Sequence, residues 1–228
     1  MKPYCLILAR KRSQRIKKKN LISFDGYPLI FWTLKNAFEA KIFGKIILSS
    51  DWDELLSFSK FYFKDLILHK RKKNLSNSKA SSEKVIINII REYRLKKENY
   101  CVLLQPTSPL RKTDYIKDMW KVVKNKQLKT LYSVSEIRKK TYINKKNRFF
   151  GIQKKNLNNK KLFLNGSIYF FKTSYVLKNK TLKEKIGNYY FHQKKYSLDL
   201  DSFSDLRKFK CIYRYDKFKN LIVKTYRK

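Results

Sequence analysis

The chain is constrained above all by a regular alternation between short apolar runs and longer stretches with helical spacing. Continuous apolar runs at Tyr4–Ala9, Lys45–Ser49 and Tyr100–Leu104 are typical of strands buried on both faces. The stretches between them predict helices over Leu29–Ala40, 51–58 and Ser81–Tyr93, with a further short strand at Asp65–Leu68. This order favours an α/β fold with a doubly wound, mostly parallel sheet.

The second half of the chain follows a different pattern. Short strand-like segments at Thr130–Ser135, Arg148–Ile152 and Ser167–Phe171 are separated by turns rich in lysine and asparagine, and Ser202–Tyr213 has helical spacing. We therefore expect a small antiparallel extension over about 130–171 and a final helix. Because no internal repeat or linker interrupts the sequence, we predict a single domain over residues 1–228.

The high net charge of the chain does not by itself identify the class of partner. The 228 residues include 56 Lys and Arg and 17 Asp and Glu, which gives a formal charge of +39. Such a charge is typical of proteins that bind nucleic acid or other phosphorylated partners. The lysines are spread along the whole chain, however, and an A/T-rich genome that favours Lys and Asn codons explains them equally well. A basic nucleic-acid-binding protein therefore remains one alternative.

The cysteines and the apolar runs indicate a soluble protein of a reducing compartment. Cys5 and Cys101 fall in strand-like runs and Cys211 in a helical pattern, with no CxxC and no Cys/His pair at metal spacing. The N-terminal apolar run is too short for a signal peptide, and none approaches the ~18 residues of a membrane span. We expect a cytoplasmic protein without membrane partners.

The first candidate site is the loop Arg10–Asn20, which follows the first predicted strand. Ligands of doubly wound sheets bind beyond the carboxyl ends of the strands, and the cationic side chains of this loop suit phosphate groups. The loop contains no glycine and matches neither a Walker loop nor a Rossmann fingerprint. Taken alone, it is better explained as a solvated basic loop or a nucleic-acid patch.

A second candidate follows the strand that ends at Leu104. Pro106 and Pro109 restrict the backbone of this loop and hold its polar side chains in place, which suits a hydroxylated, anionic ligand. These side chains are Gln105, Thr107, Ser108 and Arg111. The alternative is an ordinary proline-stiffened helix entry with Thr113 as N-cap, but the composition of Leu103–Arg111 is too particular for that alone.

Two further segments carry weaker signals. In a strand, Asp199 and Asp201 would point to the same face, where paired carboxylates suit Mg²⁺ that bridges to substrate phosphates. For two aspartates alone, the favoured alternative is that Asp201 or Ser202 caps the following helix while Asp199 pairs with a lysine. The Asn165–Gly166 pair marks a turn ahead of a strand, which by itself predicts only a hairpin.

Taken together and in this order, the segments resemble the CMP-N-acylneuraminate synthetase (acylneuraminate cytidylyltransferase) family, which includes enzymes for sialic, pseudaminic and legionaminic acids. LILARKRSQRIKKKN is similar to the family's N-terminal motif, and LLQPTSPLR matches its central motif. NGSIYF and SLDLDSFSDL resemble two later motifs of the family. KASSEKVI resembles the family's helix start that lies near the base of the nucleotide. The resemblance runs from about Tyr4 to Leu206.

The resemblance implies a nucleotide-diphospho-sugar transferase type of fold, a homodimer whose extension reaches the partner subunit, and Mg²⁺ as cofactor. It implies that CTP and a nonulosonic sugar acid give a CMP-sugar and pyrophosphate. For the nucleotide it implies Arg10, Ser13, Lys19, Asn20 and Ser82, with Arg10, Lys19 and Asp201 in catalytic roles. For the sugar it implies Gln105, Thr107, Ser108, Arg111 and Asn165, with Arg111 helping to secure the Gln105 loop. For the metal it implies Asp199 and Asp201.

At three positions the sequence departs from the family pattern. Gln14 stands in place of a lysine, Ser78 of an acidic residue and Phe163 of an arginine. These departures keep open a catalytically weak or degenerate homologue that acts as a binding protein. A CMP-Kdo synthetase is a closer rival, whereas a nucleic-acid-binding protein is supported by the charge alone. The sequence does not identify the sugar.

Overall fold

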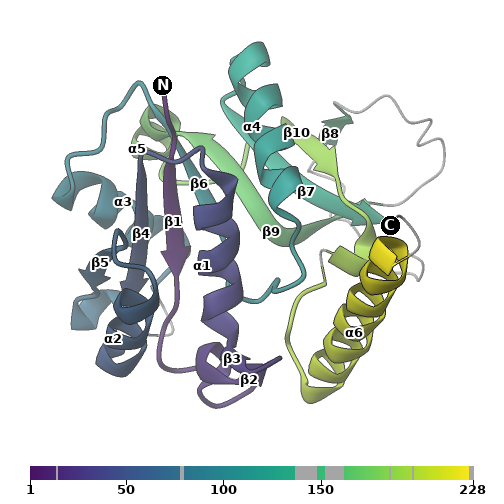
Figure 1. The fold of residues 1–228 in the computed structure, drawn as a ribbon. Helices are drawn as coiled ribbons and strands as arrows, with labels where there is room; N and C mark the ends of the chain where they lie inside the picture. The colour runs from purple at the N-terminus through teal and green to yellow at the C-terminus, as the bar shows by residue number, and fades with distance from the viewer. Residues whose placement is uncertain are drawn as a thin grey trace.

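In the computed structural model, eight strands form one mixed sheet in the order β5-β4-β1-β6-β9-β7-β10-β8 (Figure 1). The structure describes residues 1–13, 15–77, 80–136, 148–151, 162–184, 186–196 and 198–225. The strands expected in the first half all form and pair in parallel. They are β1 (Tyr4–Leu8), β4 (Lys45–Ser50), β5 (Ile67–Lys70) and β6 (Tyr100–Leu104).

The expected helices form between these strands. They are α1 (Leu29–Ala40), α2 (Asp53–Tyr62) and α3 (Ser82–Glu92), and α4 (Thr113–Lys126) follows β6. The alternative interpretation of this loop made Thr113 the N-cap of α4; Thr113 is instead the first helical residue, and Lys112 occupies the cap position without a side-chain hydrogen bond. Shorter elements complete this half: η1 (Lys19–Leu21), the hairpin β2 (Ser23–Phe24) and β3 (Tyr27–Pro28), and η2 (Lys73–Leu75).

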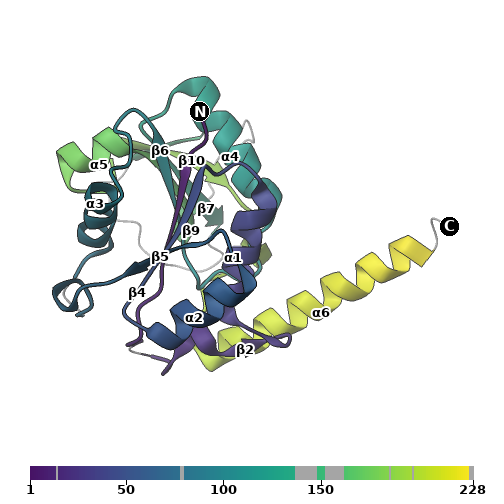
Figure 2. The ribbon, with the colours of Figure 1, turned by 60° about the vertical axis from the view of Figure 1, so that its left-hand side comes forward.

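Helices cover both faces of the sheet, which confirms the α/β class (Figure 2). One core layer lies against α1, α2 and α4 and includes Ile7, Leu48 and Val102 of the strands. The other lies against α3 and α5 (Thr173–Asn179) and includes Leu6, Ile47 and Leu103. Neighbouring strand residues thus alternate between the layers, so the strands are apolar throughout.

The second half joins the same sheet, and the antiparallel pairing expected of the extension occurs, among the strands described there, only at β9. The strands β7 (Thr130–Glu136), β9 (Leu162–Lys172), β10 (Ile186–Phe191) and β8 (Arg148–Gly151) continue the sheet beyond β6. Among the described strands of this sheet, only β9 is antiparallel to its neighbours, β6 and β7. These pairings join segments far apart in the sequence, which local patterns do not specify. Residues 137–147 and 152–161, half of the expected extension, lie outside the described part.

The C-terminal helix α6 (Phe203–Thr225) is much longer than expected and extends away from the body of the molecule (Figure 2). It begins with a capping box: the Asp205 amide donates to the Ser202 hydroxyl at 3.2 Å, and the Asp205 carboxylate accepts from the Ser202 amide at 2.9 Å. Ser202, one of the two expected caps, therefore has this role. In the part of the chain that the structure describes, no helix is long and apolar enough to cross a membrane.

Candidate active site

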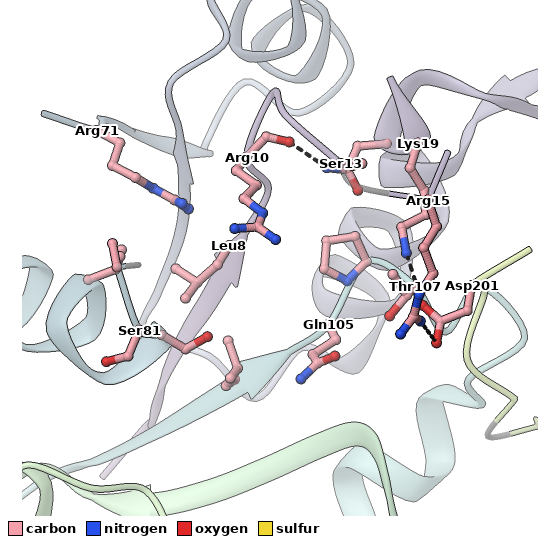
Figure 3. Close-up of a pocket in the computed structure, with 16 residues that line it drawn as sticks. Leu8, Arg10, Ser13, Arg15, Lys19, Arg71, Ser81, Gln105, Thr107 and Asp201 are labelled. Carbon is pink, nitrogen blue, oxygen red and sulfur yellow. Dashed lines mark hydrogen bonds and ion pairs between the residues drawn. The ribbon is translucent and has the colours of Figure 1, made fainter. Parts of the chain in front are cut away.

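A cavity of about 510 Å³ opens beyond the carboxyl ends of β1, β5 and β6, and we call it the site cavity (Figure 3). It contains residues from three of the four segments that the sequence analysis selected, although these are far apart in the chain. The residues expected at the site that line it are Arg10, Ser13, Lys19, Asn20, Ser82, Gln105, Thr107 and Asp201. A doubly wound sheet thus carries its cavity where such folds bind ligands.

The loop after β1 is held in place by contacts at both ends and in its middle. The Asn20 amide group donates to the Arg10 carbonyl at 3.2 Å, and the Lys11 backbone N–H donates to the Asp51 carboxylate at 2.7 Å. Between them, Ile16 is buried in an apolar cluster that includes Leu200. The loop therefore has a defined shape without glycine, and Asn20, which we expected to contact the nucleotide, closes it.

Asp201 is the carboxylate of the site cavity, and two cations of the N-terminal loop hold it. Arg15 forms an ion pair with Asp201, and the Lys19 ammonium lies 3.4 Å from its other oxygen. Lys19 also donates to the Leu200 carbonyl at 2.7 Å. These contacts connect the N-terminal loop to the segment before α6 (Figure 3). The alternative drawn from the sequence paired Asp199 with a lysine, whereas among the described residues Lys19 and Arg15 form their ion pairs with Asp201.

Asp199 lies beside the site cavity and not in its lining. The described residues 198–201 belong to no strand; instead, the buried Leu200 donates its N–H to the Thr107 carbonyl at 2.9 Å and fixes the segment. The Asp199 side chain is open to solvent yet close to protein on several sides. Partial loss of water raises the pKa of its carboxyl, the Thr107 hydroxyl lowers it through a hydrogen bond, and Asp201 raises it again.

Arg111 lies beneath the cavity and supports its floor. Its guanidinium is buried, donating to the Gln105 carbonyl at 2.5 Å and to the carbonyl and hydroxyl of Ser167 at 3.1 and 3.0 Å. Burial lowers the pKa of Arg111 to about 9. Ser108 is also buried, and neither its hydroxyl nor Arg111 Nη1 has a partner among the described residues. Both residues lie outside the lining. Ser108 was expected to orient the sugar, whereas Arg111 holds the Gln105 loop as the resemblance implies.

Asn165 and Gly166 form a bulge in β9, which corrects the expected hairpin turn. The strand continues on both sides of them, and its register against β7 shifts at this point. The Asn165 side chain accepts from the Ser133 hydroxyl at 2.6 Å and donates to the Ser135 hydroxyl at 2.9 Å. Asn165 is buried and outside the cavity lining, so these bonds give it a structural role in stabilising the bulge.

The bulge also explains why a glycine follows Asn165. Gly166 has φ +74°, and a Cβ added there would lie 3.2 Å from Oε1 of Gln105. Glycine therefore serves both the backbone conformation and the close approach of a cavity side chain. Gln105 is thus held from below by Arg111 and from the side by Gly166.

Arg71 is a cavity residue that the sequence analysis missed. It follows β5, and its buried guanidinium donates to the hydroxyl and carbonyl of Ser49 at 3.2 and 3.1 Å. Burial lowers the pKa of Arg71, Asp51 raises it, and the nearby Arg10 lowers it further. Lys70 and Lys72 flank Arg71 in the sequence, so composition alone could not single it out. Its place after a parallel strand was the available signal.

The start of α3 forms the remaining wall of the site cavity. Ser81 is its N-cap and accepts from the Lys84 amide at 3.3 Å, and Ser82 is the first helical residue. Ala80 and Val85 line the cavity beside them. The wall thus combines free amides of a helix start with small and apolar side chains. Of the noted departures, Gln14 and Ser78 lie outside the described residues, and Phe163 lies in β9.

Together these features suit a polyanionic ligand that also carries hydroxyl groups. Four cations, from Arg10, Arg15, Lys19 and Arg71, line the cavity with the single carboxylate of Asp201. Gln105 and Thr107 add neutral donors and acceptors to the same lining. No group of three or more metal-ligating side chains occurs among the described residues. The aspartate pair is therefore a partial donor set that a ligand would complete.

Comparison with known proteins agrees with this chemistry. A family model described as cytidylyltransferase matches residues 4–225. The pseudaminic acid cytidylyltransferase of Campylobacter jejuni is 29% identical over 227 residues, covering 94% of this chain and 97% of that protein. The N-acylneuraminate cytidylyltransferase of Streptococcus agalactiae is 33% identical over 147 residues, covering 61% of this chain and 33% of that protein.

Solved structures share the fold at low sequence identity. A CMP:2-keto-3-deoxy-manno-octonic acid synthetase, complexed with CTP, superimposes with a TM-score of 0.70 at 12% identity, covering 95% of this chain and all of that one. A 4-diphosphocytidyl-2C-methyl-D-erythritol synthase does so with a TM-score of 0.68 at 7% identity, covering 93% and 98%. Because the family model spans nearly the whole chain, the protein belongs to the cytidylyltransferase family.

Proposed function

We propose that this enzyme transfers CMP from CTP to a nonulosonic, sialic-acid-like sugar acid and releases pyrophosphate. One observation carries the proposal: four cations and one carboxylate line a single cavity together with the Gln105 loop. The full-length similarity to a pseudaminic acid cytidylyltransferase supports the class of sugar. The fold is then of the nucleotide-diphospho-sugar transferase type.

We assign the two ends of the site cavity to the two substrates. The start of α3, with Ser82 and Val85, suits the base of CTP, since it offers backbone amides beside an apolar side chain. Arg10, Lys19 and Arg71 suit the triphosphate. Gln105 and Thr107 suit the hydroxyl groups of the sugar. Ser13 lies between the cations and completes the phosphate end.

The chemistry is an in-line displacement at phosphorus. The anomeric hydroxyl oxygen of the sugar bonds to the α-phosphorus while the bond from that phosphorus to the pyrophosphate oxygen breaks, and the hydroxyl proton passes to water. The enzyme contributes mainly position and charge: the Gln105 loop orients the sugar, and Arg10 and Lys19 neutralise charge that accumulates on the departing pyrophosphate. The support of Gln105 by Arg111 matters because small displacements of an oriented reactant are costly.

The aspartates fit the Mg²⁺ that this reaction class implies. Mg²⁺ prefers hard oxygen ligands and is commonly held by one or two carboxylates together with substrate phosphates, which is the donor set that Asp199 and Asp201 provide. When bound, the ion would reduce the repulsion between the phosphates and the incoming oxygen. Arg15 and Lys19 occupy Asp201 in this structure, and the triphosphate would draw both cations toward itself.

We further propose a homodimer with a single domain per subunit, in which the extension of about 130–171 contacts the partner. The support is the resemblance of the whole chain to its family, because half of that segment lies outside the described residues. Light scattering coupled to size-exclusion chromatography would give the mass directly. A monomeric mass at micromolar concentration would contradict the proposal.

The decisive experiment measures pyrophosphate release that depends on CTP and Mg²⁺ across a panel of sialic, legionaminic, pseudaminic and Kdo sugar acids. We expect release with one nonulosonic acid and none from Asp201→Ala. Thr113→Val, outside the cavity lining, serves as an active control. Silence with every sugar from a protein that binds CTP would instead identify a degenerate homologue that only binds the nucleotide.

A further inference from the structure

A second cavity of about 1040 Å³ adjoins the site cavity on the outer side of the N-terminal loop. It lies between that loop and the segment around η2, and we call it the basic groove. Its lining consists of Arg10, Lys11, Arg12, Ser13, Lys17, Lys18, Asp51, Lys73, Ser76 and Asn77. Arg10 and Ser13 line both cavities, so the two are contiguous at the phosphate end of the proposed active site.

The basic groove has an excess of positive charge that the protein does not neutralise. Six of its lining residues are cationic and one, Asp51, is acidic. The Asp51 carboxylate already accepts the Lys11 backbone N–H at 2.7 Å. Among the described residues, none of the side chains of Lys11, Arg12, Lys17, Lys18 and Lys73 forms an ion pair. Like charges gathered in one concavity repel each other unless an anion joins them.

This arrangement differs from that of the neighbouring cations. Arg15 and Lys19, from the same loop, both meet Asp201, and Lys70, from the same strand end as Lys73, meets Asp53 at 2.8 Å. General lysine enrichment explains neither contrast, because paired and unpaired cations alternate within a few residues. The unpaired ones gather on the groove side of the loop.

The groove is also built on a fixed frame. Ile16 is buried in the apolar cluster and anchors the middle of the loop directly before Lys17. Lys18 adopts the left-handed conformation with φ 52°, where the chain turns into η1. On the other wall, the η2 turn presents Lys73. Cations from two distant segments therefore converge on one volume.

We propose that the basic groove is a second anion site that binds inorganic pyrophosphate while CTP occupies the site cavity. The inference rests on the proposed function, since pyrophosphate is the product of that reaction. The four cations of the site cavity suffice for the triphosphate of CTP, and the sugar acid brings a single carboxylate. Pyrophosphate is the remaining polyanion, and it leaves from the end of the site where Arg10 and Ser13 open into the groove.

The test separates this site from ordinary product binding. Pyrophosphate is titrated calorimetrically into enzyme saturated with a CTP analogue that carries a methylene group between the α- and β-phosphorus. A product that binds only in the triphosphate position is displaced by the analogue, whereas a groove site still takes up pyrophosphate. We expect one pyrophosphate to bind per subunit in addition to the bound analogue. Loss of all pyrophosphate binding in the presence of the analogue would overturn the proposal.

A pair of charge-matched variants locates the site. Lys17→Gln with Lys73→Gln removes two groove cations, neither of them assigned to catalysis, and should weaken this binding about tenfold, as expected for two exposed charge contacts. Lys124→Gln with Lys126→Gln removes the same charge from the far end of α4 and should leave it unchanged. Equal weakening by both pairs would show general electrostatic attraction and overturn the proposal.

The same proteins distinguish failure of this inference from failure of the proposed function. Binding of the analogue and formation of CMP-sugar are measured in parallel on each variant. A wild-type enzyme that makes CMP-sugar but binds no pyrophosphate beside the analogue refutes only the proposed groove site. A protein that binds pyrophosphate beside the analogue but converts no sugar acid refutes the proposed function and leaves the groove as an anion site.

Discussion

The bulge at Gly166 predicts that one methyl group will disturb the sugar end of the site without touching a substrate. In Gly166→Ala, the backbone must hold a side chain at φ +74°, which costs about 1–2 kcal/mol for an L-residue. For a chain of this size, that corresponds to a fall in Tm of roughly 2–8 °C. The new Cβ also lies 3.2 Å from Oε1 of Gln105, so Gln105 must move by a few tenths of an ångström.

That movement sets the size of the kinetic effect. A misplacement of about 1 Å in an active site costs on the order of 100-fold, so a few tenths should cost about fivefold. We expect Gly166→Ala to lower kcat/KM for the sugar acid about fivefold, measured by pyrophosphate release at saturating CTP. The KM for CTP should stay unchanged, because the residues proposed to contact the triphosphate belong to other loops.

Gly26 provides a matched control for the backbone term. It also has positive φ, +82°, in the β2–β3 turn, but an added Cβ would meet nothing within 4 Å. Gly26→Ala should therefore lose similar stability and keep normal kinetics. Equal kinetic constants in the two variants would refute the assignment of Gln105 to the sugar, as would a rise confined to the KM for CTP.

Three further changes test the frame around the site. Leu200→Ala leaves a cavity at a fully buried position between the two aspartates, so the free energy of unfolding measured in urea should fall by about 3 kcal/mol. Most of the activity should be lost with it, and retained activity would contradict the anchoring role of Leu200. Asp199→Asn should abolish turnover and leave the protein equally or more stable at pH 7. The pKa of Asp199 is raised in the folded protein, so its ionisation destabilises the fold as the pH rises through that pKa, and asparagine removes this cost. A variant less stable than the wild type at pH 7 would contradict this direction of the pKa shift. Burial lowers the pKa of His192 to about 3, so the wild type should lose about 1.4 kcal/mol per pH unit from pH 6.5 downward, and a His192→Leu variant that kept this slope would exclude His192 as its source.

The sequence predicted the first half of the fold well because each strand there is buried on both faces. An apolar run such as β6 can then be identified without knowing its neighbours. The second half could not be predicted in this way, since β9 pairs with both β6 and β7 and its bulge carries the only turn signal. No helix-termination signal marks the end of α6 in the sequence, because residues 203–225 contain neither glycine nor proline.

The residues of the candidate site were likewise predictable where they follow a buried strand and not where their role depends on distant pairings. Residues that directly follow a predicted strand, Arg10 and Gln105 among them, line the cavity. Arg111 and Asn165 were selected for the same motifs but stabilise the site from below, because their polar atoms bind backbone and hydroxyl groups inside the sheet. Arg71 was missed, since its role depends on the pairing of β5 with β4. Motifs thus mark the site, and only packing separates contact residues from supporting ones.

The ion pairs of Asp201 explain how so cationic a site stays assembled before a substrate enters, and they predict coupling between the ligands. Arg15 and Lys19 use Asp201 as their anion in this structure. A triphosphate that takes both cations leaves Asp201 without them, and a divalent cation is the natural replacement. CTP and the divalent cation should therefore each strengthen the binding of the other by the same factor.

Calorimetric titration of CTP with and without Mg²⁺ measures this coupling, and Asp201→Asn isolates its source. The variant keeps the size of the side chain but removes the charge for which the cations and the metal compete. CTP should bind the variant at least as tightly as the wild type without Mg²⁺, because its triphosphate no longer competes with a carboxylate for Arg15 and Lys19. The gain from Mg²⁺ should then shrink to what the metal confers on CTP in solution. If the full gain persists, Asp201 is not the residue that links the two ligands, and the ion pairs are merely structural.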